Sequence, residues 1–310
     1  MRPTKAVYVD WHLPRRTRGQ ISLCKKNWEI ALIHRTTYFA REYNSLIPVL
    51  YCDEETFKYY KLVGLDQCFD EIYPILPMKT DFDSSIFWAA GKFMAMQHVD
   101  QSFVMMDLDA EVRFELEFDD SDVFCSHIER IHRDDICYYP SPEYLDTQNF
   151  LGEKYGFKWD YKAYNTALIY FKDIQIAKEY AETALEYIRS VNQIDPAFEL
   201  GYIIMIEQRF LYEFCRSNSL KVSTLITGEY VTVNTRIGED AYFSESNIDE
   251  IGKKGFLHVW GFKTKMHDSV EKSNDLYESL SLSRENLTKQ IQDSVAINMD
   301  IFEREKLIFS

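Results

Sequence analysis

Residues 103–110 read FVMMDLDA, and this stretch decides the fold of the 310-residue chain. Four consecutive apolar residues are typical of a strand that is buried on both faces, in the middle of an α/β sheet. Two aspartates, Asp107 and Asp109, follow at the carboxyl end of that strand. Open α/β sheets bind their ligands at this edge, because loops and helix N-termini converge there. The stretch therefore predicts a central strand that delivers two carboxylates to a ligand site.

The spacing of the two aspartates predicts a cation site. The alternation of side chains along an extended strand places Asp107 and Asp109 on one face. Two carboxylates on one face can bind a single hard divalent cation. Such a cation can bridge diphosphate oxygens and neutralise the charge that develops on a leaving nucleotide. The triplet D-x-D is also common on solvated turns, so both interpretations stay open for the triplet alone.

Short apolar runs and helical patterns alternate on both sides of this stretch, as in an α/β domain. From residue 269 onward the sequence becomes polar and helix-forming. We therefore expect one α/β domain over residues 1–265 and a helical tail over residues 266–310. The tail either packs back on its domain, which we prefer, or docks on a partner. The predicted strands are residues 6–9, 46–51, 71–75, 102–106, 122–127, 164–171, 220–226 and 230–233, and the predicted helices are residues 27–43, 54–62, 86–98, 174–192 and 200–215.

The composition restricts the class of ligand. The chain has 50 Asp and Glu against 35 Lys and Arg, a formal net charge of −15. A chain this acidic gains little from counterion release, so nucleic acid is excluded as a partner. An anionic ligand such as a nucleotide diphosphate would require a bound metal or a few well-placed cations.

The sequence also indicates where the protein works. No segment approaches the roughly 18 apolar residues that span a bilayer, and the N-terminus does not resemble a signal peptide. The six cysteines form no C-x-x-C pair, and we expect reduced thiols in the core. We therefore expect a cytoplasmic protein without a transmembrane segment. Peripheral membrane contact and the oligomeric state stay open.

A second motif lies near the end of the predicted domain, where residues 257–265 read LHVWGFKTK. The imidazole of His258 can complete a carboxylate metal site. Gly261 allows the backbone to approach a phosphate closely, and Lys263 or Lys265 can meet its charge. A single histidine is more often a packed core residue, and that interpretation stays open.

Taken in order, the motifs resemble those of the nucleotide-diphospho-sugar transferases of the GT-A fold, particularly the glycogenin-like and bacterial galactosyltransferase-like retaining group. There an apolar strand ends in D-x-D, and a later strand opens F-N-S-G or F-N-A-G, similar to YNTA at residues 164–167. A following helix carries D-Q, similar to Glu207-Gln208, and a C-terminal H-x-x-G-x-x-K resembles residues 258–265. A related bacterial group has W-x-x-G-K, as in residues 88–92. The resemblance covers about residues 5–265.

The resemblance implies a GT-A-like mixed sheet flanked by helices and a metal-dependent glycosyltransferase. The enzyme would move a sugar from a nucleotide diphosphate donor, a UDP-sugar being favoured, to a saccharide or glycolipid acceptor. Asp107 and Asp109 would hold Mn²⁺ or Mg²⁺ together with His258. The resemblance also implies that the base contacts Val9, Asp10 and Trp11 and that Lys92 lies near the donor. The diphosphate would contact Gly261, Lys263 and Lys265. The transferred sugar and the acceptor would lie beside Asn165, Glu207 and Gln208.

Three departures from the family pattern keep a second function open. Glu207 replaces the usual aspartate, Ala167 stands where glycine is commoner, and Lys263 and Lys265 lie one residue on either side of the expected lysine. A transferase fold that binds nucleotide or metal without turnover, as part of an assembly, would tolerate such changes.

Two further alternatives follow from single motifs. An apolar strand followed by D-x-D also describes haloacid-dehalogenase-like phosphatases, but there it usually ends the first strand, and a Thr or Val stands where this chain has Glu111. A zinc site from Cys125, His127, His132 and Cys137 has suitable ligand types, yet its spacing matches no familiar pair of zinc knuckles.

Overall fold

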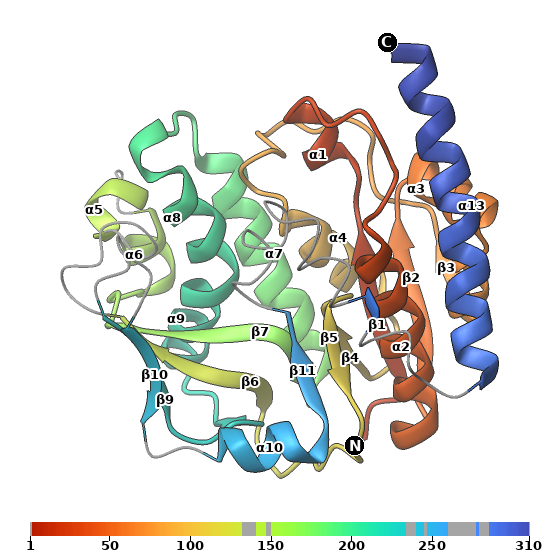
Figure 1. Cartoon of the computed structure of the whole chain (residues 1–310). Helices are drawn as coiled ribbons and strands as arrows, with labels where there is room; N and C mark the ends of the chain where they lie inside the picture. Colours follow the sequence, from red (N-terminus) through yellow and green to blue (C-terminus); the bar gives the residue numbers. More distant parts are fainter. Residues whose placement is uncertain are drawn as a thin grey trace. The chain divides into compact units, whose positions relative to one another are not determined.

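The structure is a computed structural model that describes residues 2–131, 141–146, 150–233, 240–244, 247–259, 277–278 and 285–309 (Figure 1). Its fold is mixed α/β, with helices flanking a mixed sheet, as the sequence predicts. The chain divides into two compact units, and each unit is assembled from segments that are distant in the sequence.

One unit, unit A, consists of residues 4–78, 106–116 and 254–310. Its three parallel strands are ordered β1-β2-β3, with Val7 opposite Val49. A separate antiparallel pair joins β5 to β11. Figure 1 shows the C-terminal helix α13 lying along α2 and α3. The elements are β1 (Lys5–Asp10), α1 (Leu13–Thr17), α2 (Asn27–Asn44), β2 (Ile47–Cys52), α3 (Glu54–Val63), η1 (Leu65–Cys68), β3 (Glu71–Tyr73), β5 (Ala110–Val112), β11 (Phe256–His258) and α13 (Glu285–Phe309).

The ends of α3 show how the sequence fixes a helix in this unit. The Asp53 carboxylate accepts the backbone N–H of Thr56 at 2.8 Å. This N–H lies in the first turn of the helix and has no carbonyl partner within the helix. Gly64 ends the helix with a φ of +76°, a left-handed conformation that glycine adopts without strain. The ends of this helix are therefore set locally, and they position its first turn beside the carboxyl end of β1.

The other unit, unit B, consists of residues 1–3, 79–105 and 117–253. Its strands are ordered β10-β9-β6-β7-β4, and β8 also pairs with β6. The last residues of β4 and α10 belong to unit A. The elements are α4 (Ala90–His98), β4 (Phe103–Met106), β6 (Val123–Arg130), α5 (Pro142–Leu145), α6 (Phe150–Tyr155), β7 (Lys162–Phe171), α7 (Ile174–Ser190), η2 (Pro196–Phe198), α8 (Glu199–Ile204), η3 (Met205–Arg209), α9 (Phe210–Ser217), β8 (Val222–Thr224), β9 (Glu229–Val233), β10 (Asp240–Ser244) and α10 (Ile248–Lys254).

Several predicted elements differ from those observed. The helix predicted at residues 86–98 begins only at Ala90, because turns occupy the preceding residues. The helix predicted at residues 200–215 is interrupted by a π-helical turn at Met205–Arg209. The short strands β5 and β11 were not predicted, since three residues give too little alternation to be recognised.

The described part of the C-terminal tail packs back on its own unit. Leu287, Ile291 and Val295 of α13 are buried, and the helix contacts α2 and α3. Of the two interpretations of the tail, this arrangement favours packing back over docking on a partner. The predicted boundary at residue 265 lies outside the described residues and stays a prediction. No helix within the described ranges is long and apolar enough to cross a membrane. The five cysteines that the structure describes are free thiols.

Candidate functional site

The two aspartates of the D-x-D triplet lie on a tight turn. β4 ends at Met106, and the backbone N–H of Ala110 donates to the Asp107 carbonyl at 3.0 Å, so the chain reverses over Asp107–Ala110. The prediction that strand alternation aligns the two carboxylates is therefore wrong. The turn brings them together instead, because it folds the backbone between them.

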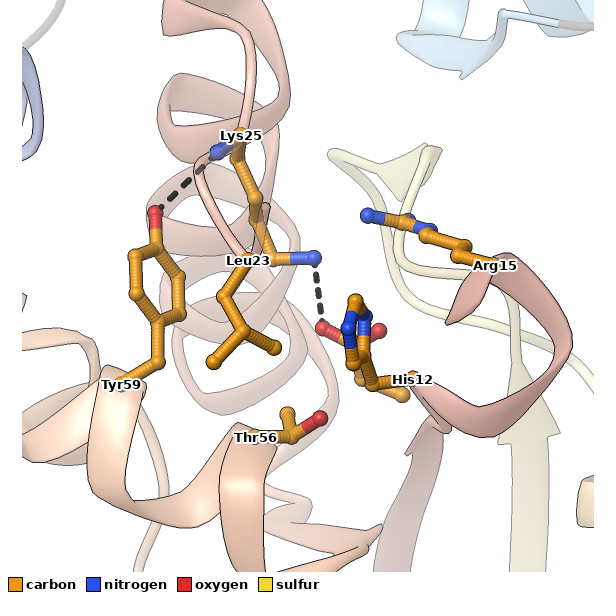
Figure 2. Close-up of a pocket in the computed structure, with 7 residues that line it drawn as sticks. His12, Arg15, Leu23, Lys25, Thr56 and Tyr59 are labelled. Carbon is orange, nitrogen blue, oxygen red and sulfur yellow. Dashed lines mark hydrogen bonds and ion pairs between the residues drawn. The ribbon is translucent and has the colours of Figure 1, made fainter. Parts of the chain in front are cut away.

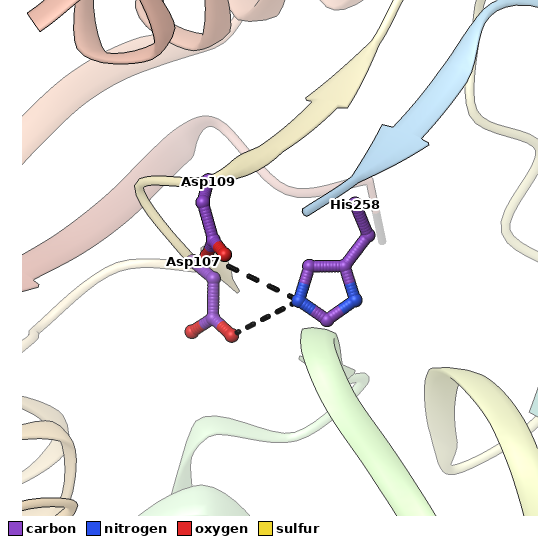
Figure 3. Close-up of side chains that lie close together, drawn as sticks. All are labelled: Asp107, Asp109 and His258. Atoms are coloured by element: carbon purple, nitrogen blue, oxygen red, sulfur yellow. Dashed lines mark ion pairs between the residues drawn. The ribbon is translucent and has the colours of Figure 1, made fainter. Parts of the chain in front are cut away.

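The β5–β11 pair brings His258 to this turn. His258 lies opposite Ala110 in the register, and the N–H of Val259 donates to the Asp109 carbonyl at 3.2 Å. The imidazole Nε2 is 3.8 Å from Asp107 Oδ2 and 4.0 Å from Asp109 Oδ1 (Figure 3). Three side chains from two distant parts of the sequence thus point toward one another.

The donor set fits a hard divalent cation. One ligand atom from each of Asp107, Asp109 and His258 lies within 4.8 Å of the other two. Ligands at about 2.1 Å from an octahedral ion are about 3–4 Å apart, so a small closure would accommodate Mg²⁺ or Mn²⁺. Within the part of the chain that the structure describes, this is the single group of three or more acidic, histidine or cysteine side chains arranged in this way.

Buried charges hold β5 in place beside the cluster. Glu111, which is 0% exposed, accepts two bonds from the Arg35 guanidinium, at 2.7 and 2.9 Å, and one ion pair from Arg113 at 2.9 Å. The Thr36 hydroxyl donates to the Ala110 carbonyl at 2.5 Å. These bonds fix the strand that follows Asp109. Sequence analysis did not identify Arg35 or Thr36, because both lie on α2 and no local pattern links them to β5.

A glycine permits the approach of β11. Gly255 has a φ of +114°, and a Cβ added there would lie 2.7 Å from the Arg113 Cβ. Its carbonyl accepts the Arg113 N–H at 3.1 Å. A larger residue would clash with β5 and displace the strand that carries His258.

The carboxyl end of β1 also carries a polar cluster. Asp10 is buried and accepts the Lys25 ammonium at 2.6 Å and the Tyr60 hydroxyl at 2.8 Å. Burial alone would raise the pKa of Asp10, but Lys25 and Arg15 outweigh that effect and hold the pKa at about 2. Trp11 is buried too, and its indole N–H donates to the Pro77 carbonyl at 2.8 Å. Asp10 and Trp11, two of the residues predicted to contact the base, therefore form these polar contacts with other residues of unit A.

In unit B, the structure brings together Lys92 and Glu207, two of the predicted site residues. The Lys92 ammonium forms an ion pair with Glu207 Oε1, and the Thr166 hydroxyl donates to the same oxygen at 2.6 Å. Glu207 lies on the π-helical turn, a feature frequent at functional sites, and its carbonyl accepts the Tyr180 hydroxyl at 3.0 Å. Gln208, the next residue, is partly buried.

Asn165 contacts a different acidic residue. Its side-chain amide donates to Glu129 Oε1 at 3.1 Å, and its side-chain oxygen accepts the Ala167 N–H at 3.1 Å. His127 Nε2 is 3.5 Å from the same Glu129 oxygen. Asn165 thus belongs to a buried polar cluster on β6 and β7.

The remaining predicted residues fall into two groups. Gly261, Lys263 and Lys265 lie outside the described residues, as do His132 and Cys137 of the zinc alternative. Within the described ranges, Cys125 and His127 belong to no group of three possible metal ligands. Burial raises the pKa of the Cys125 thiol well above its usual range, which disfavours the thiolate that zinc binds.

The fold and this geometry define an α/β protein with a carboxylate–imidazole cluster at the end of a buried strand. The sequence matches the family described as "Family of unknown function (DUF6734)" over residues 79–289, and the chain belongs to this family. No curated protein matches it.

Two structures of the galactosyltransferase LgtC, one in complex with donor and acceptor sugar analogs and one of an active-site mutant, each align with a TM-score of 0.41. Each is 10% identical in sequence, and the alignment covers 92% of this chain and 99% of that chain.

Proposed function

We propose that the protein is a metal-dependent glycosyltransferase of the GT-A type, which moves a sugar from a nucleotide diphosphate donor to a saccharide or glycolipid acceptor. The observation that carries the proposal is the convergence of Asp107, Asp109 and His258 at the end of a buried strand in an α/β fold. The order of the motifs along the sequence supports it independently.

In this function the cluster has a defined chemical task. Asp107, Asp109 and His258 would hold Mn²⁺ or Mg²⁺, and the ion, when bound, would stabilise the negative charge of the departing diphosphate. Arg35 and Arg113 neutralise the nearby Glu111, so that this third carboxylate does not repel the diphosphate. The fixed β5–β11 pair keeps the imidazole oriented toward the carboxylates, so little reorganisation is required at the moment of reaction.

For Glu207 and Gln208 of unit B we propose the role that the resemblance implies, which is contact with the transferred sugar. Glu207 and Gln208 occupy the place of the family's D-Q pair, and a carboxylate there can accept hydroxyl groups of the transferred sugar. Lys92 and Thr166 orient the Glu207 carboxylate, since both bind one of its oxygens. The second oxygen, Oε2, is the one we assign to the sugar.

Two alternatives remain distinguishable by experiment. An inactive binding protein of the same fold is favoured by Glu207, whose longer side chain is bound to Lys92 where the family has aspartate. A haloacid-dehalogenase-like phosphatase is disfavoured, because the position at which those enzymes carry Thr or Val is Glu111, buried in an ion pair with Arg35.

The test is calorimetric titration of UDP and of GDP, with and without Mn²⁺, on wild type and on Asp109→Asn. Loss of a residue that only supports a metal ligand typically weakens metal binding about 10–100-fold. Asp109 is proposed to bind the metal directly, so Asp109→Asn is expected to weaken the binding of Mn²⁺, and the metal-dependent binding of nucleotide, at least about tenfold. Asp120→Asn removes the same charge at an exposed position paired with Lys172, and it should bind as wild type does.

The outcomes separate the candidate functions. Metal-dependent nucleotide binding that Asp109→Asn weakens supports the proposal, and transfer or hydrolysis of a UDP-sugar then separates an enzyme from a binding protein. Absence of metal-dependent binding for both nucleotides in wild type would show that the proposal is wrong.

A further inference from the structure

Ala110 is the residue that relates the three side chains of the proposed metal site to one another. It follows Asp109 directly, and its N–H donates to the Asp107 carbonyl at 3.0 Å, which closes the turn between the two aspartates. In the β5–β11 register, Ala110 lies opposite His258. All four residues belong to unit A. A displacement of Ala110 would therefore change the distances among all three candidate ligands at once.

A hydroxyl group of α2 holds the Ala110 carbonyl. The Thr36 side chain donates to this carbonyl at 2.5 Å, although the two residues are 74 positions apart in the sequence. Thr36 is 1% exposed and Ala110 is 0% exposed, so water does not compete for the bond. The carbonyl is a backbone group, and its bond to Thr36 therefore fixes the path of the chain where β5 begins, immediately after Asp109.

Tyr8 of β1 lies beside the Thr36 hydroxyl. The Tyr8 hydroxyl is 3.4 Å from Thr36 Oγ1 and 3.8 Å from the sulfur of Met106, the residue before Asp107. Burial raises the pKa of Tyr8 above its ordinary value, so the hydroxyl keeps its proton. Because the single hydrogen of the Thr36 hydroxyl is on the Ala110 carbonyl, Tyr8 is the donor in their contact. Both contacts of Tyr8 are longer than the Thr36–Ala110 bond, so Thr36 is the stronger anchor.

The preceding residue of α2 acts on β5 in a different way. Arg35 binds the side chain of Glu111, at 2.7 and 2.9 Å. A side chain can rotate about its own bonds while the backbone stays in place. The bond from Thr36 acts on the backbone itself, at the residue that joins the three candidate ligands.

We propose that Thr36 is a positioning residue for the divalent cation, which it does not itself contact. Its hydroxyl keeps Ala110 in place before the cation binds, so that binding requires a small closure of three side chains and no folding of the turn. The inference rests on the proposed function, because that function assigns the cation to Asp107, Asp109 and His258. It extends that function by giving a residue of α2 control over metal affinity.

The experiment measures the affinity for Mn²⁺ by calorimetry, alone and in the presence of UDP, in wild type, Thr36→Val and Thr36→Ser. Valine has the shape of threonine without its hydroxyl, and serine keeps the hydroxyl. Thr36→Val should weaken Mn²⁺ binding about tenfold, the lower end of the range for residues that support a metal ligand. Thr36→Ser should bind Mn²⁺ as wild type does, since it retains the bond to the Ala110 carbonyl.

Two control variants separate positioning from general destabilisation. Thr37 is also 1% exposed, but its hydroxyl donates to the Ile33 carbonyl, at 2.8 Å, within α2 itself. The Tyr59 hydroxyl joins two segments of unit A elsewhere, because it accepts the Lys25 backbone N–H at 3.2 Å (Figure 2). Thr37→Val and Tyr59→Phe each remove a buried hydrogen bond and should lower the melting temperature, yet both should leave Mn²⁺ affinity unchanged. Each variant is measured at a temperature at which its circular dichroism matches wild type.

A measurement on wild type keeps the inference testable if Thr36→Val folds poorly. Because the Thr36 bond is present before the cation binds, the amide hydrogen of Ala110 should exchange slowly with deuterated water both without and with Mn²⁺. Fast exchange that becomes slow only when Mn²⁺ is added would overturn the inference.

Failure of this inference and failure of the proposed function give different results. If Asp109→Asn weakens Mn²⁺ binding while Thr36→Val binds Mn²⁺ as Thr37→Val does, the metal site of the proposed function stands and the role of Thr36 is wrong. If wild type binds no Mn²⁺ with or without UDP, the metal site and this inference are both wrong.

Discussion

Replacing Asp10 with asparagine is expected to destabilise the protein at neutral pH, and progressively less so as the pH falls toward 2. Asp10 is 7% exposed and binds the Lys25 ammonium at 2.6 Å and the Tyr60 hydroxyl at 2.8 Å. Although burial opposes ionisation, the charges of Lys25 and Arg15 bring the pKa of Asp10 to about 2, compared with 3.8 for an ordinary aspartate.

The size of the effect follows from this difference in pKa. A shift from 3.8 to about 2, at about 1.4 kcal/mol per pKa unit, corresponds to about 2–3 kcal/mol of folding free energy. Because the folded-state pKa is the lower one, the contribution is complete well above pH 3.8 and is lost as the pH falls through about 2. About half of it should be gone at pH 3. The variant also leaves a buried Lys25 ammonium without its carboxylate, which raises the cost at pH 7 to about 3 kcal/mol or more.

The assay is urea unfolding at pH 7, 5 and 3 for wild type, Asp10→Asn, Lys25→Met and the double variant. If the pair acts as a unit, the double variant should be less destabilised than the sum of the single variants, by about 2 kcal/mol at pH 7. The exposed pair of Arg16 and Glu55, also at 2.8 Å, provides the control, because Glu55→Gln should cost less than about 1 kcal/mol.

Two results would refute this reasoning. One is a coupling energy below about 0.5 kcal/mol at pH 7, within the ordinary error of additivity. The other is a cost of Asp10→Asn that is the same at pH 3 and at pH 7. Either result would mean that Asp10 and Lys25 do not stabilise the folded state as an ion pair.

Two further predictions concern β11 and the buried pair of unit B. Gly255→Ala should cost about 1–3 kcal/mol and weaken Mn²⁺ binding, since its φ of +114° and the 2.7 Å approach to Arg113 leave no room for a Cβ. Gly252→Ala, whose Cβ would meet no atom within 4 Å, should be neutral in both measurements, and equal effects at the two glycines would contradict the argument. Glu207→Gln should lower stability in urea unfolding by about 2 kcal/mol or more, because Lys92 is 8% exposed and would lose its carboxylate. A cost below about 0.5 kcal/mol would show that this pair does not hold unit B together.

The parts of the fold that sequence predicts are those in which a local pattern determines the structure. The apolar run before Asp107 forms the buried strand β4, and Asp53 and Gly64 mark the two ends of α3. In each case the physical cause acts over a few residues: burial on both faces, a capped N–H, or a left-handed conformation. The D-x-D triplet itself was placed on the wrong local structure, because nothing in residues 107–109 distinguishes an extended strand from a tight turn.

What the sequence could not predict depends on contacts between distant residues. β11 is three residues long, and its pairing with β5 depends on Gly255 fitting against Arg113. The Asn298 amide donates to the Lys25 carbonyl at 3.0 Å although the two residues are far apart in the sequence, and an asparagine in a polar helix gives no sign of such a contact. These are tertiary contacts, and their energies come from burial and hydrogen bonds that exist only in the folded state.

A net charge of −15 would be compatible with the proposed anionic donor, because several buried carboxylates have basic partners. Three buried carboxylates each have a basic partner: Asp10 has Lys25, Glu111 has Arg35, and Glu207 has Lys92. Each ion pair cancels most of the electrostatic potential of its carboxylate, so the net charge of the chain does not give the local charge around these residues.

The imidazole of His258 lies beside both Asp107 and Asp109. His258 lies 3.8 and 4.0 Å from their oxygens, longer than the 3.2 Å at which nitrogen–oxygen hydrogen bonds usually end. These distances place three ligand atoms around one point without joining them to each other, which is the geometry that a shared cation requires.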